Sequence, residues 1–424
     1  MTCLLRWFGP VVVGTTLIAG RPSPVSAQQP HRFDPERLAR IDRAMADLVD
    51  RGAMAGAVTL ILHDGVAVHR GAYGWADKPA GRRLEHDALF RIASQTKAIT
   101  AVGVMLLVEE GRLTLADPVS RYLPSFARTT VAVATDTGRA IVPARRPITI
   151  RDLLTHTSGI SYGTDPLVAP LYQAQGLGPA AGFGWYTADK DEPICDTMDR
   201  LGALPFVRQP GEAYVYGYGN DIAGCLIERV AGLPLDRFFA ARIFAPLGMN
   251  DTYFFVPTDK AARLAAVHRD SAGSIVLAPE GARGQGHYVQ GPRRSFAGGA
   301  GLVSTAPDYG RFLQMLLNGG ALDGVRLLAP STVRLLTANS VGTMHSGDGY
   351  GYSLAFQTTE RTGAGAAPQS VGSYGWGGAY QSSYLVDPAE GVIAILLTQH
   401  LPNLAVDVRG IFRNLVYQAL VPAP

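Results

Sequence analysis

The chain of 424 residues is 47% hydrophobic and 17% charged, a composition typical of a globular protein with a large core and not of a disordered chain. Its formal net charge of +3 is too small to favour nucleic acid or an anionic membrane surface as a partner. The length allows one large domain or two intertwined domains.

The first 27 residues predict a cleavable signal peptide. Arg6 supplies a positive charge, residues 7–19 are apolar, and VSA (25–27) is a small-residue cleavage site. The apolar run is shorter than the roughly 20 residues that a membrane-spanning helix needs. We therefore expect a secreted or periplasmic protein, cut after Ala27, with no membrane span once the signal is removed.

The two ends of the remaining chain have similar patterns. Residues 34–52 have the apolar spacing of a helix, and residues 57–74 read as two strands around a turn at 63–65. Residues 382–399 read as two more strands, and residues 405–420 as an amphipathic helix. This pattern predicts an α+β fold with an antiparallel sheet built from both chain ends and flanked by the terminal helices.

The middle of the chain is predicted to be mainly helical. Its helical segments are 97–113, 149–156, 220–232, 235–248 and 306–320. We expect a discontinuous sheet domain of residues 28–92 and 297–424, and a mainly helical subdomain of residues 93–296 that carries the active-site loops.

Residues 160–210 are rich in glycine and proline, and a loop of this length is usually functional or disordered. We expect a partly ordered wall over the site, and a surface insertion without a role is the alternative. The aromatic residues of this stretch are Tyr162, Tyr172, Phe183, Trp185 and Tyr186.

Two cysteines, Cys195 and Cys225, remain after the leader is removed. They could form a disulfide in an oxidising compartment, or stay as two buried thiols, because the sequence does not give the distance between their Cα atoms. Neither these cysteines nor the nine histidines have metal-binding spacing, so we expect no metal and no cofactor.

Ser94 and Lys97 stand three residues apart in IASQTKAIT (92–100), which places them on one face of a helix start. Only four of the 38 basic residues are lysine, and lysine, unlike arginine, can lose its proton when it is desolvated. The apolar helix that follows predicts a buried start, where the lysine could activate the serine as a nucleophile. A serine N-cap followed by an exposed lysine is the alternative.

Two later segments could complete such a site. In PGEAYVYGYGNDIAG (210–224), Tyr216 could hydrogen-bond to Lys97 and Ser94 and return a proton to the leaving group, or it could simply pack in a turn. In YGWGGAYQSSYLVDP (374–388), the pair Gly377 and Gly378 would let a substrate approach closely, although an ordinary β-bulge has the same pattern.

The three motifs SQTK (94–97), YGY (216–218) and WGG (376–378) resemble those of the serine β-lactamase and penicillin-binding-protein superfamily. The resemblance is closest to class C β-lactamase-like hydrolases, the family VIII carboxylesterases, and it extends over nearly all of residues 34–420. It implies a β-lactamase/transpeptidase-like fold and an acyl-enzyme at Ser94, with Lys97 and Tyr216 moving protons.

The resemblance also assigns the substrate edge. Trp376, Gly377, Gly378 and Ala379 would line it, and the backbone N–H groups of Ala379 and Ser94 would form an oxyanion hole. We further expect Tyr218, Tyr162 and Trp185 to form part of the substrate wall.

Two departures from the β-lactamase pattern favour esters over lactams. Position 218 is tyrosine where β-lactamases have asparagine, and position 376 is tryptophan where they have lysine. Both changes remove polar groups that hold a lactam, and Trp376 adds an apolar surface. We therefore expect a carboxylesterase acting on a small-molecule ester or amide. The alternatives are a class C-type β-lactamase, a D-amino-acid peptidase or acyltransferase, and a non-catalytic penicillin-binding sensor.

A second serine also has a nucleophile motif. GISYG (159–163) matches the G-x-S-x-G elbow, and His156 lies close by in the sequence. The elbow needs a strand before it and a helix after it, whereas a helical segment precedes Ser161 and a loop follows it. We therefore expect Ser161 not to be the nucleophile, and His156 to order a turn.

Overall fold

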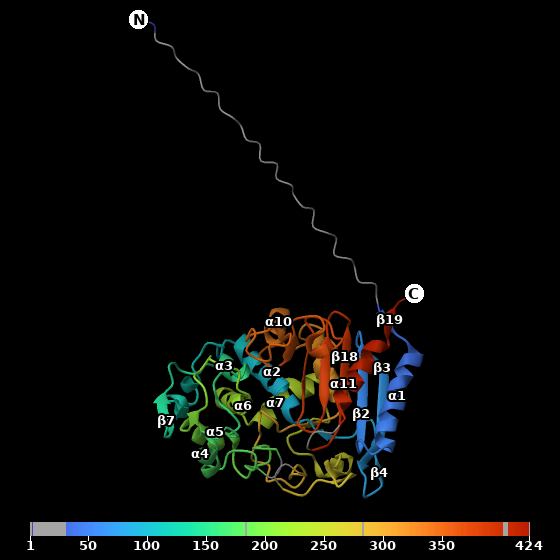
Figure 1. The fold of residues 1–424 in the computed structure, drawn as a ribbon, viewed down its shortest axis with the longest axis horizontal. Helices are drawn as coiled ribbons and strands as arrows, with labels where there is room; N and C mark the ends of the chain where they lie inside the picture. Colours follow the sequence, from blue (N-terminus) through green and yellow to red (C-terminus); the bar gives the residue numbers. More distant parts are fainter. Residues whose placement is uncertain (1, 3–30, 183–184, 282–283, 402–405, 424) are drawn as a thin grey trace.

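The computed structural model describes residues 2, 31–182, 185–281, 284–401 and 406–423 (Figure 1). The predicted signal peptide and Phe183 lie outside these residues. No helix within the described ranges has the length and apolar character needed to cross a bilayer.

An antiparallel sheet of eight strands joins the two ends of the chain (Figure 1). The junction is the pairing of β18 with β2, in which Val392 lies opposite His63 and Leu397 opposite Val58. The hairpins predicted at 57–74 and 382–399 are both present in this sheet. In spatial order its strands are β14 (Tyr350–Tyr352), β15 (Gln357–Thr359), β16 (Tyr374–Gly377), β17 (Ser383–Asp387), β18 (Val392–Leu397), β2 (Gly56–His63), β3 (Val66–Asp77) and β4 (Arg82–Arg83).

Successive side chains of a strand point to opposite faces of the sheet. The central strands are apolar on both faces, and helices cover both of them. Ile61 and Leu396 pack with the terminal helices α1 (Pro35–Asp50) and α11 (Val408–Gln418). On the other face, Gly310 of α9 (Ala306–Leu317) lies close to Leu60 of β2, where a Cβ at this glycine would come within 3.1 Å of the leucine side chain. The predicted sheet with flanking terminal helices is confirmed.

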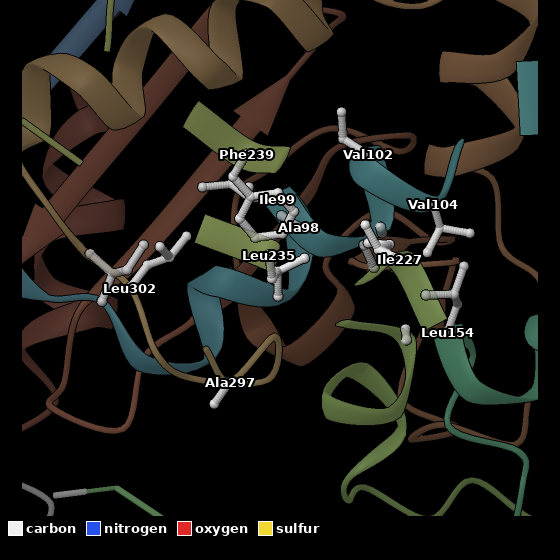
Figure 2. Packing of buried hydrophobic residues seen from close by; sticks show 14 of the residues in the cluster. Ala98, Ile99, Val102, Val104, Leu154, Ile227, Leu235, Phe239, Ala297 and Leu302 are labelled. Atoms are coloured by element: carbon white, nitrogen blue, oxygen red, sulfur yellow. The ribbon is translucent and has the colours of Figure 1, made fainter. Parts of the chain in front are cut away.

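The helical part of the chain surrounds α2 (Thr96–Glu109), which is buried from Thr96 to Leu107. Gly103 brings α2 against its neighbours, since a Cβ there would lie 3.0 Å from both Ile227 and Phe239. Figure 2 shows the apolar side chains around this helix. Helices α6 (Gly219–Ala231) and α10 (Pro330–Thr337) pack against α2, and α3 (Ile150–Leu154), α5 (Ile194–Gly202) and α7 (Leu235–Phe239) pack against α6.

The middle of the chain also contains strands that the sequence did not predict. Strands β6 (Thr130–Thr135), β7 (Gly138–Pro143) and β8 (Pro205–Phe206) form a three-stranded sheet, and β9 (His268–Ser271) pairs with β10 (Ser274–Leu277). The proposed boundaries of the two domains remain a prediction.

The helix predicted at 235–248 is interrupted. After α7 the chain forms one π-turn at Ala240–Phe244 and a last helical turn, α8 (Ala245–Leu247), which ends at Gly248 in the left-handed region with φ 65°. The remaining elements are β1 (His31–Phe33), β5 (Phe90–Arg91), the 3₁₀ turn Ala93–Gln95, α4 (Ala169–Ala174), β11 (Val303–Ser304), β12 (Ala321–Leu322), β13 (Val325–Arg326) and β19 (Leu420–Pro422), with further 3₁₀ turns at Val119–Arg121, Pro124–Phe126, Thr258–Arg263 and Ala364–Ala366.

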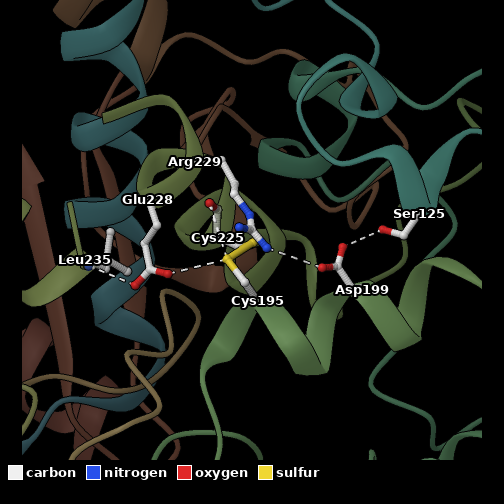
Figure 3. Close-up of a disulfide and its surroundings, with 7 residues drawn as sticks. All are labelled: Ser125, Cys195, Asp199, Cys225, Glu228, Arg229 and Leu235. Atoms are coloured by element: carbon white, nitrogen blue, oxygen red, sulfur yellow. Dashed lines mark hydrogen bonds and ion pairs between the residues drawn. A yellow bond between two sulfur atoms is a disulfide. The ribbon is translucent and has the colours of Figure 1, made fainter. Parts of the chain in front are cut away.

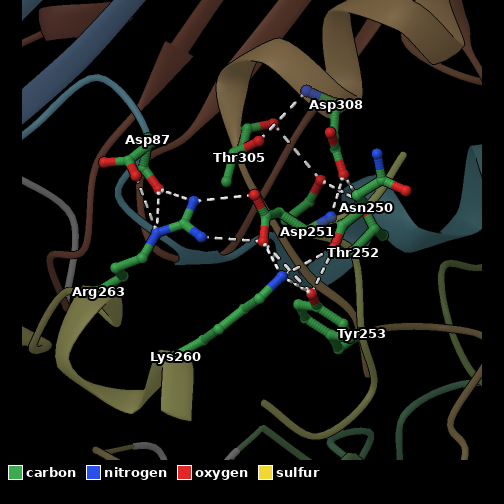
Figure 4. A network of polar contacts seen from close by, with 10 residues as sticks. Asp87, Asn250, Asp251, Thr252, Tyr253, Lys260, Arg263, Thr305 and Asp308 are labelled. Carbon is green, nitrogen blue, oxygen red and sulfur yellow. Dashed lines mark hydrogen bonds and ion pairs between the residues drawn. The ribbon is translucent and has the colours of Figure 1, made fainter. Parts of the chain in front are cut away.

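A polar network fixes the segment that leads to the site (Figure 4). The Asp308 carboxylate at the start of α9 accepts hydrogen bonds from the Asp251 N–H at 2.7 Å and from the Thr252 hydroxyl at 2.9 Å. Asp251 in turn pairs with Lys260 at 2.7 Å and with Arg263 at 2.9 Å. Strand β11 directly precedes α9 and pairs with β5, which leads into the 3₁₀ turn that carries Ser94. By fixing the start of α9, the network also fixes the register of β11 against β5.

Cys195 and Cys225 form a disulfide that joins α5 to α6 (Figure 3). An ion pair between Arg229 and Asp199, at 3.5 Å, links the same two helices. The Asp199 carboxylate also accepts a hydrogen bond from Ser125 at 2.8 Å. The disulfide therefore anchors the end of the 160–210 segment to the helix that follows Tyr216.

Replacing both cysteines by serine is expected to lower the free energy of unfolding by about 3–4 kcal/mol. The disulfide closes a loop with a sequence separation of 30, and the estimate is the loop-closure entropy restored to the unfolded chain. Denaturant titration of the double variant and of the wild type, with and without reductant, measures this loss. The prediction fails if the oxidised wild type and the double variant have the same unfolding midpoint.

Candidate active site

A cavity of about 710 Å³ lies at the end of β16 and is lined by both the sheet and the helical part of the chain. Ser94 lines it from the start of α2, and the WGG segment lines it from the sheet. Tyr162, Trp185 and Tyr216 line it from the loops before α6. The cavity therefore brings together segments that are more than 280 residues apart in the sequence.

Ser94 lies in the 3₁₀ turn Ala93–Gln95, which continues directly into α2. The residue before it, Ala93, has a φ of 44°, a left-handed conformation that a residue with a Cβ rarely adopts. Such strain persists only where the surrounding structure imposes it, and it concentrates at functional sites. Among the described residues, no acceptor is recorded for the backbone N–H of Ser94.

Lys97 is fully buried, with 0% of its surface exposed. Its Nζ lies 2.7 Å from the Gly299 carbonyl oxygen, 3.0 Å from the Tyr162 hydroxyl and 3.3 Å from Ser94 Oγ. The carbonyl can only accept a hydrogen bond, whereas both hydroxyls can also donate one. A neutral Lys97 amine can therefore donate to Gly299 and accept the Ser94 proton. The alternative of an exposed lysine beside a serine N-cap is excluded.

The ring of Tyr216 lies against the amine of Lys97. Lys97 Nζ lies 4.7 Å from the ring centroid, and the Tyr216 hydroxyl accepts a hydrogen bond from Trp376 Nε1 at 3.2 Å. Within the described residues, no hydrogen bond joins this hydroxyl to Ser94 or Lys97, so the predicted contact is not present. The physical reason is that the Trp376 indole N–H, which can only donate, holds the Tyr216 hydroxyl.

Tyr162 makes the contact that we expected of Tyr216. Burial raises the pKa of Tyr162 well above its ordinary value, and the neighbouring Tyr216 and Asp221 raise it further. The group is therefore a neutral phenol at pH 7, able to donate a hydrogen bond to Lys97 or to accept one from it. The sequence placed Tyr162 only in the substrate wall, because nothing in SGISYG indicates that the chain returns to the lysine.

Asp221 is a functional candidate that the sequence did not reveal. Its carboxylate is almost fully buried, at 2% exposure, and accepts hydrogen bonds from the Gly299 N–H and the Thr187 hydroxyl, both at 3.2 Å. Burial raises its pKa to about 6, and the positive charge of Lys97 opposes this rise. Gly299 is required here, since a Cβ would lie 2.3 Å from Asp221 Oδ2.

The aromatic wall is ordered in the described part of 160–210. The Tyr162 and Tyr186 rings lie 4.3 Å apart, and Trp185 contacts the Tyr380 ring at 5.9 Å. Tyr218 is fully buried, and its hydroxyl accepts a hydrogen bond from the Gly178 N–H at 2.9 Å. Its ring lies 4.8 Å from that of Tyr162, so Tyr218 supports the wall from behind and does not line the cavity.

The WGG edge lies against the turn that carries the serine. A Cβ at Gly378 would come within 2.7 Å of the Ile92 carbonyl oxygen, so only glycine allows this approach. The Gly378 N–H donates to the Ser382 carbonyl at 2.8 Å. For the Ala379 N–H, no acceptor is recorded among the described residues, which leaves this donor available at the cavity.

Ser161 has a different environment. It lies in irregular backbone after α3, and its hydroxyl accepts a hydrogen bond from the Gly163 N–H at 3.1 Å. The neighbouring His156 is fully buried, and its ring packs 4.6 Å from that of Tyr216. Burial, aided by Lys97, lowers the pKa of His156 well below its ordinary value, so this histidine is neutral. The strand–turn–helix geometry of a nucleophile elbow is absent at Ser161.

A buried Ser–Lys pair at the start of a helix, beside a glycine-rich strand edge, defines a serine hydrolase of the β-lactamase fold. The family model for β-lactamase matches residues 41–418, and the chain belongs to this family.

Several relatives cover most of the chain. Protein Rv1367c of Mycobacterium tuberculosis is 35% identical, with 86% of this chain and 90% of that protein aligned. Esterase EstB of Burkholderia gladioli is 33% identical over 85% of this chain and 90% of that esterase. Among solved structures, EstCE1, a hydrolase with promiscuous acyltransferase activity, matches with a TM-score of 0.75 and 26% identity over 90% of this chain and 99% of its own.

Proposed function

We propose that this protein is a carboxylesterase that forms an acyl-enzyme at Ser94. The observation that carries the proposal is the position of Lys97 Nζ, fully buried and 3.3 Å from Ser94 Oγ. A buried lysine without a function is costly, and a serine needs a neighbouring base before it attacks a carbonyl.

In the proposed reaction, Lys97 accepts the Ser94 proton as Oγ attacks the ester carbonyl. The oxygen of the tetrahedral intermediate is negatively charged and is stabilised by the N–H groups of Ser94 and Ala379. Lys97 then returns the proton to the leaving alkoxide, and the Tyr162 hydroxyl, which contacts the amine, shares this transfer. Tyr216 lines the cavity, and its proposed role is to hydrogen-bond to the leaving oxygen there. Water attacks the acyl-enzyme in the second half of the reaction, with the same groups acting as base and acid.

Esters are the proposed substrates because aromatic residues line the cavity that contains Ser94. Trp185 and Trp376 offer flat apolar surfaces to the acyl or alcohol part of a small ester. The relationship to esterase EstB supports the same class. The similarity to EstCE1, described as a hydrolase with promiscuous acyltransferase activity, supports transfer of the acyl group to an alcohol as the second candidate.

We further propose that the protein works outside the cytoplasm, after cleavage of the signal peptide behind Ala27. The disulfide between Cys195 and Cys225 supports this location, because disulfides persist in oxidising compartments.

The proposal predicts that a fluorophosphonate probe labels Ser94 and no other residue. Mass spectrometry of the labelled protein locates the adduct, and Ser94→Ala is expected to remove it, whereas Ser161→Ala is the matched control that retains it. An adduct on Ser161 would overturn the assignment.

Activity on short p-nitrophenyl esters is then compared with activity on nitrocefin and on a D-Ala-D-Ala peptide. Turnover of the lactam or the peptide orders of magnitude faster than every ester would refute the proposed substrate class.

A further inference from the structure

The cavity at Ser94 continues around the edge of β16 to the other face of the sheet. Strand β15 pairs with β16 only at Tyr374 and Gly375, so within the described ranges no strand pairs with this edge of β16 beyond Gly375. The lining of the cavity includes side chains of α11, which covers the outer face of the sheet (Figure 1). We call this outer part the α11 lobe, lined by Gln357, Thr359, Leu385, Ala394, Arg409, Phe412, Arg413 and Val416.

Small residues on the strands open the α11 lobe. Gly375 lies opposite Leu385 in the ladder, and Leu385 lies opposite Ala394, so the three residues share the face that carries α11. A Cβ at Gly377 would lie 3.0 Å from the guanidinium of Arg409, so a side chain there would crowd this arginine. Together with Phe412, these residues give the lobe an apolar floor.

Two arginines stand over this floor, one helical turn apart on α11. Arg409 donates to the carbonyl oxygens of Gly378, at 2.6 Å, and Gln381, at 3.0 Å, and so braces the strand edge beside Ser94. Arg413 lies about 6 Å further along the helix axis. Within the described residues neither arginine forms an ion pair, and the buried Nε of Arg413 has no hydrogen-bond partner.

Three carboxylates beside α11 are already used by the fold. Glu390, which acts electrostatically on Tyr417 of α11, pairs with His31. The Asp407 carboxylate caps α11 by accepting the Gly410 N–H at 2.9 Å. The Asp387 carboxylate accepts the Tyr417 hydroxyl at 2.5 Å and the Ser370 N–H at 3.0 Å. A guanidinium over an apolar floor with no carboxylate partner is costly, and a bound anion would satisfy it.

We propose that the α11 lobe binds the anionic end of the substrate, so that the preferred substrates are amphipathic esters bearing a carboxylate several carbons from the ester bond. This inference rests on the proposed esterase function at Ser94. The ester lies between Ser94 and the WGG edge, the aliphatic chain follows the free edge of β16 over Gly375 and Gly377, and the carboxylate pairs with Arg413. Arg409 acts as a positioning residue for the edge.

The experiment compares charged and neutral esters of the same length. One series consists of p-nitrophenyl half-esters of straight dicarboxylic acids with four to ten carbons, each matched by its methyl-capped neutral form. A second series carries the carboxylate on the alcohol side, as butyrate esters of ω-hydroxy acids with matched methyl esters. In at least one series we expect kcat/KM to be about 10-fold higher for the charged form at the best length. Added salt is expected to reduce the difference.

The variant Arg413→Gln is expected to lower this charged-to-neutral ratio to within 2-fold of one. Because the ratio is taken within each variant, a general loss of activity cancels. The control Arg237→Gln removes the same charge from an exposed side chain, 78% accessible, on α7 and is expected to keep both the ratio and the rates. A charged-to-neutral ratio near one in both series of the wild type would overturn the proposal that the α11 lobe binds the anionic end of the substrate. An unchanged ratio in Arg413→Gln would overturn it as well. Hydrolysis of p-nitrophenyl butyrate in the same assay keeps that failure distinct from a failure of the esterase proposal.

Discussion

Replacing Lys97 by methionine is expected to lower kcat/KM for p-nitrophenyl butyrate by about 10³-fold while the protein stays folded. The amine is the basic group in contact with Ser94 Oγ, and positioned proton transfer contributes roughly 10²–10⁴ to a rate. Methionine is unbranched and of similar length, so it fills the space left by a side chain that is fully buried. Losing a buried amine also removes a desolvation cost, so the unfolding midpoint should not fall sharply.

Two measurements separate chemistry from folding in this variant. The unfolding midpoint tests the fold, and the rate of labelling by the fluorophosphonate probe tests the reactivity of Ser94 directly. Lys78→Met is the matched control, because Lys78 is exposed on the surface and its loss should change neither quantity. If a folded Lys97→Met variant retains activity within 10-fold of the wild type, Lys97 is not the base.

The sheet and its flanking helices could be predicted because their signals are local. Almost continuous apolar runs in β2 and β18 indicate strands that are buried on both faces, and turns at 63–65 and 387–391 define the hairpins. The burial of Lys97 could also be predicted, since the helix that follows it is apolar on every side. The two-residue strand β8 lacks such a signal, because it pairs with β6, which lies far from it in the sequence.

The partners of Lys97 could not be predicted, because they come from separate loops. Tyr162 is 65 residues away and Gly299 is 202 residues away. Asp221 has the sequence signature of an ordinary acid in the first turn of a helix, and only the fold places it beside Gly299 and the lysine. Arg409 and Arg413 likewise read as the polar face of an amphipathic helix, and the opening at the edge of β16 gives them another environment.

Asp221→Asn is expected to change the stability of the protein in a pH-dependent way. Burial raises the pKa of Asp221 from 3.8 to about 6, so the folded state binds this proton more tightly than the unfolded state does. The protonated carboxyl therefore contributes to the free energy of unfolding of the wild type. This contribution is fully present below pH 3.8 and is lost as the pH rises through 6. Asparagine cannot ionise. The free energy of unfolding of the variant, relative to that of the wild type, should therefore rise by about 2.5 kcal/mol between pH 4 and pH 7.

The same substitution is expected to slow acylation by about 10-fold at pH 7.5. The ionised carboxylate stabilises the ammonium that Lys97 becomes when it accepts the Ser94 proton, and asparagine keeps the hydrogen bond to Gly299 without the charge. Thr187→Val is the matched control, because it removes one hydrogen bond to Asp221 and leaves the charge in place.

The two readouts together distinguish an electrostatic role of Asp221 from a structural one. A structural role would lower stability equally at pH 4 and pH 7, and would reduce activity in proportion to the folded fraction. An electrostatic role predicts a variant that gains relative stability toward neutral pH while its acylation slows. The Thr187→Val protein keeps a carboxyl whose pKa is raised by burial, and the lost hydrogen bond raises that pKa further, so its stability should fall toward neutral pH at least as steeply as that of the wild type. Parallel stability curves for Asp221→Asn and the wild type across pH 4–7 would show that folding does not raise the pKa of Asp221, and would overturn the prediction.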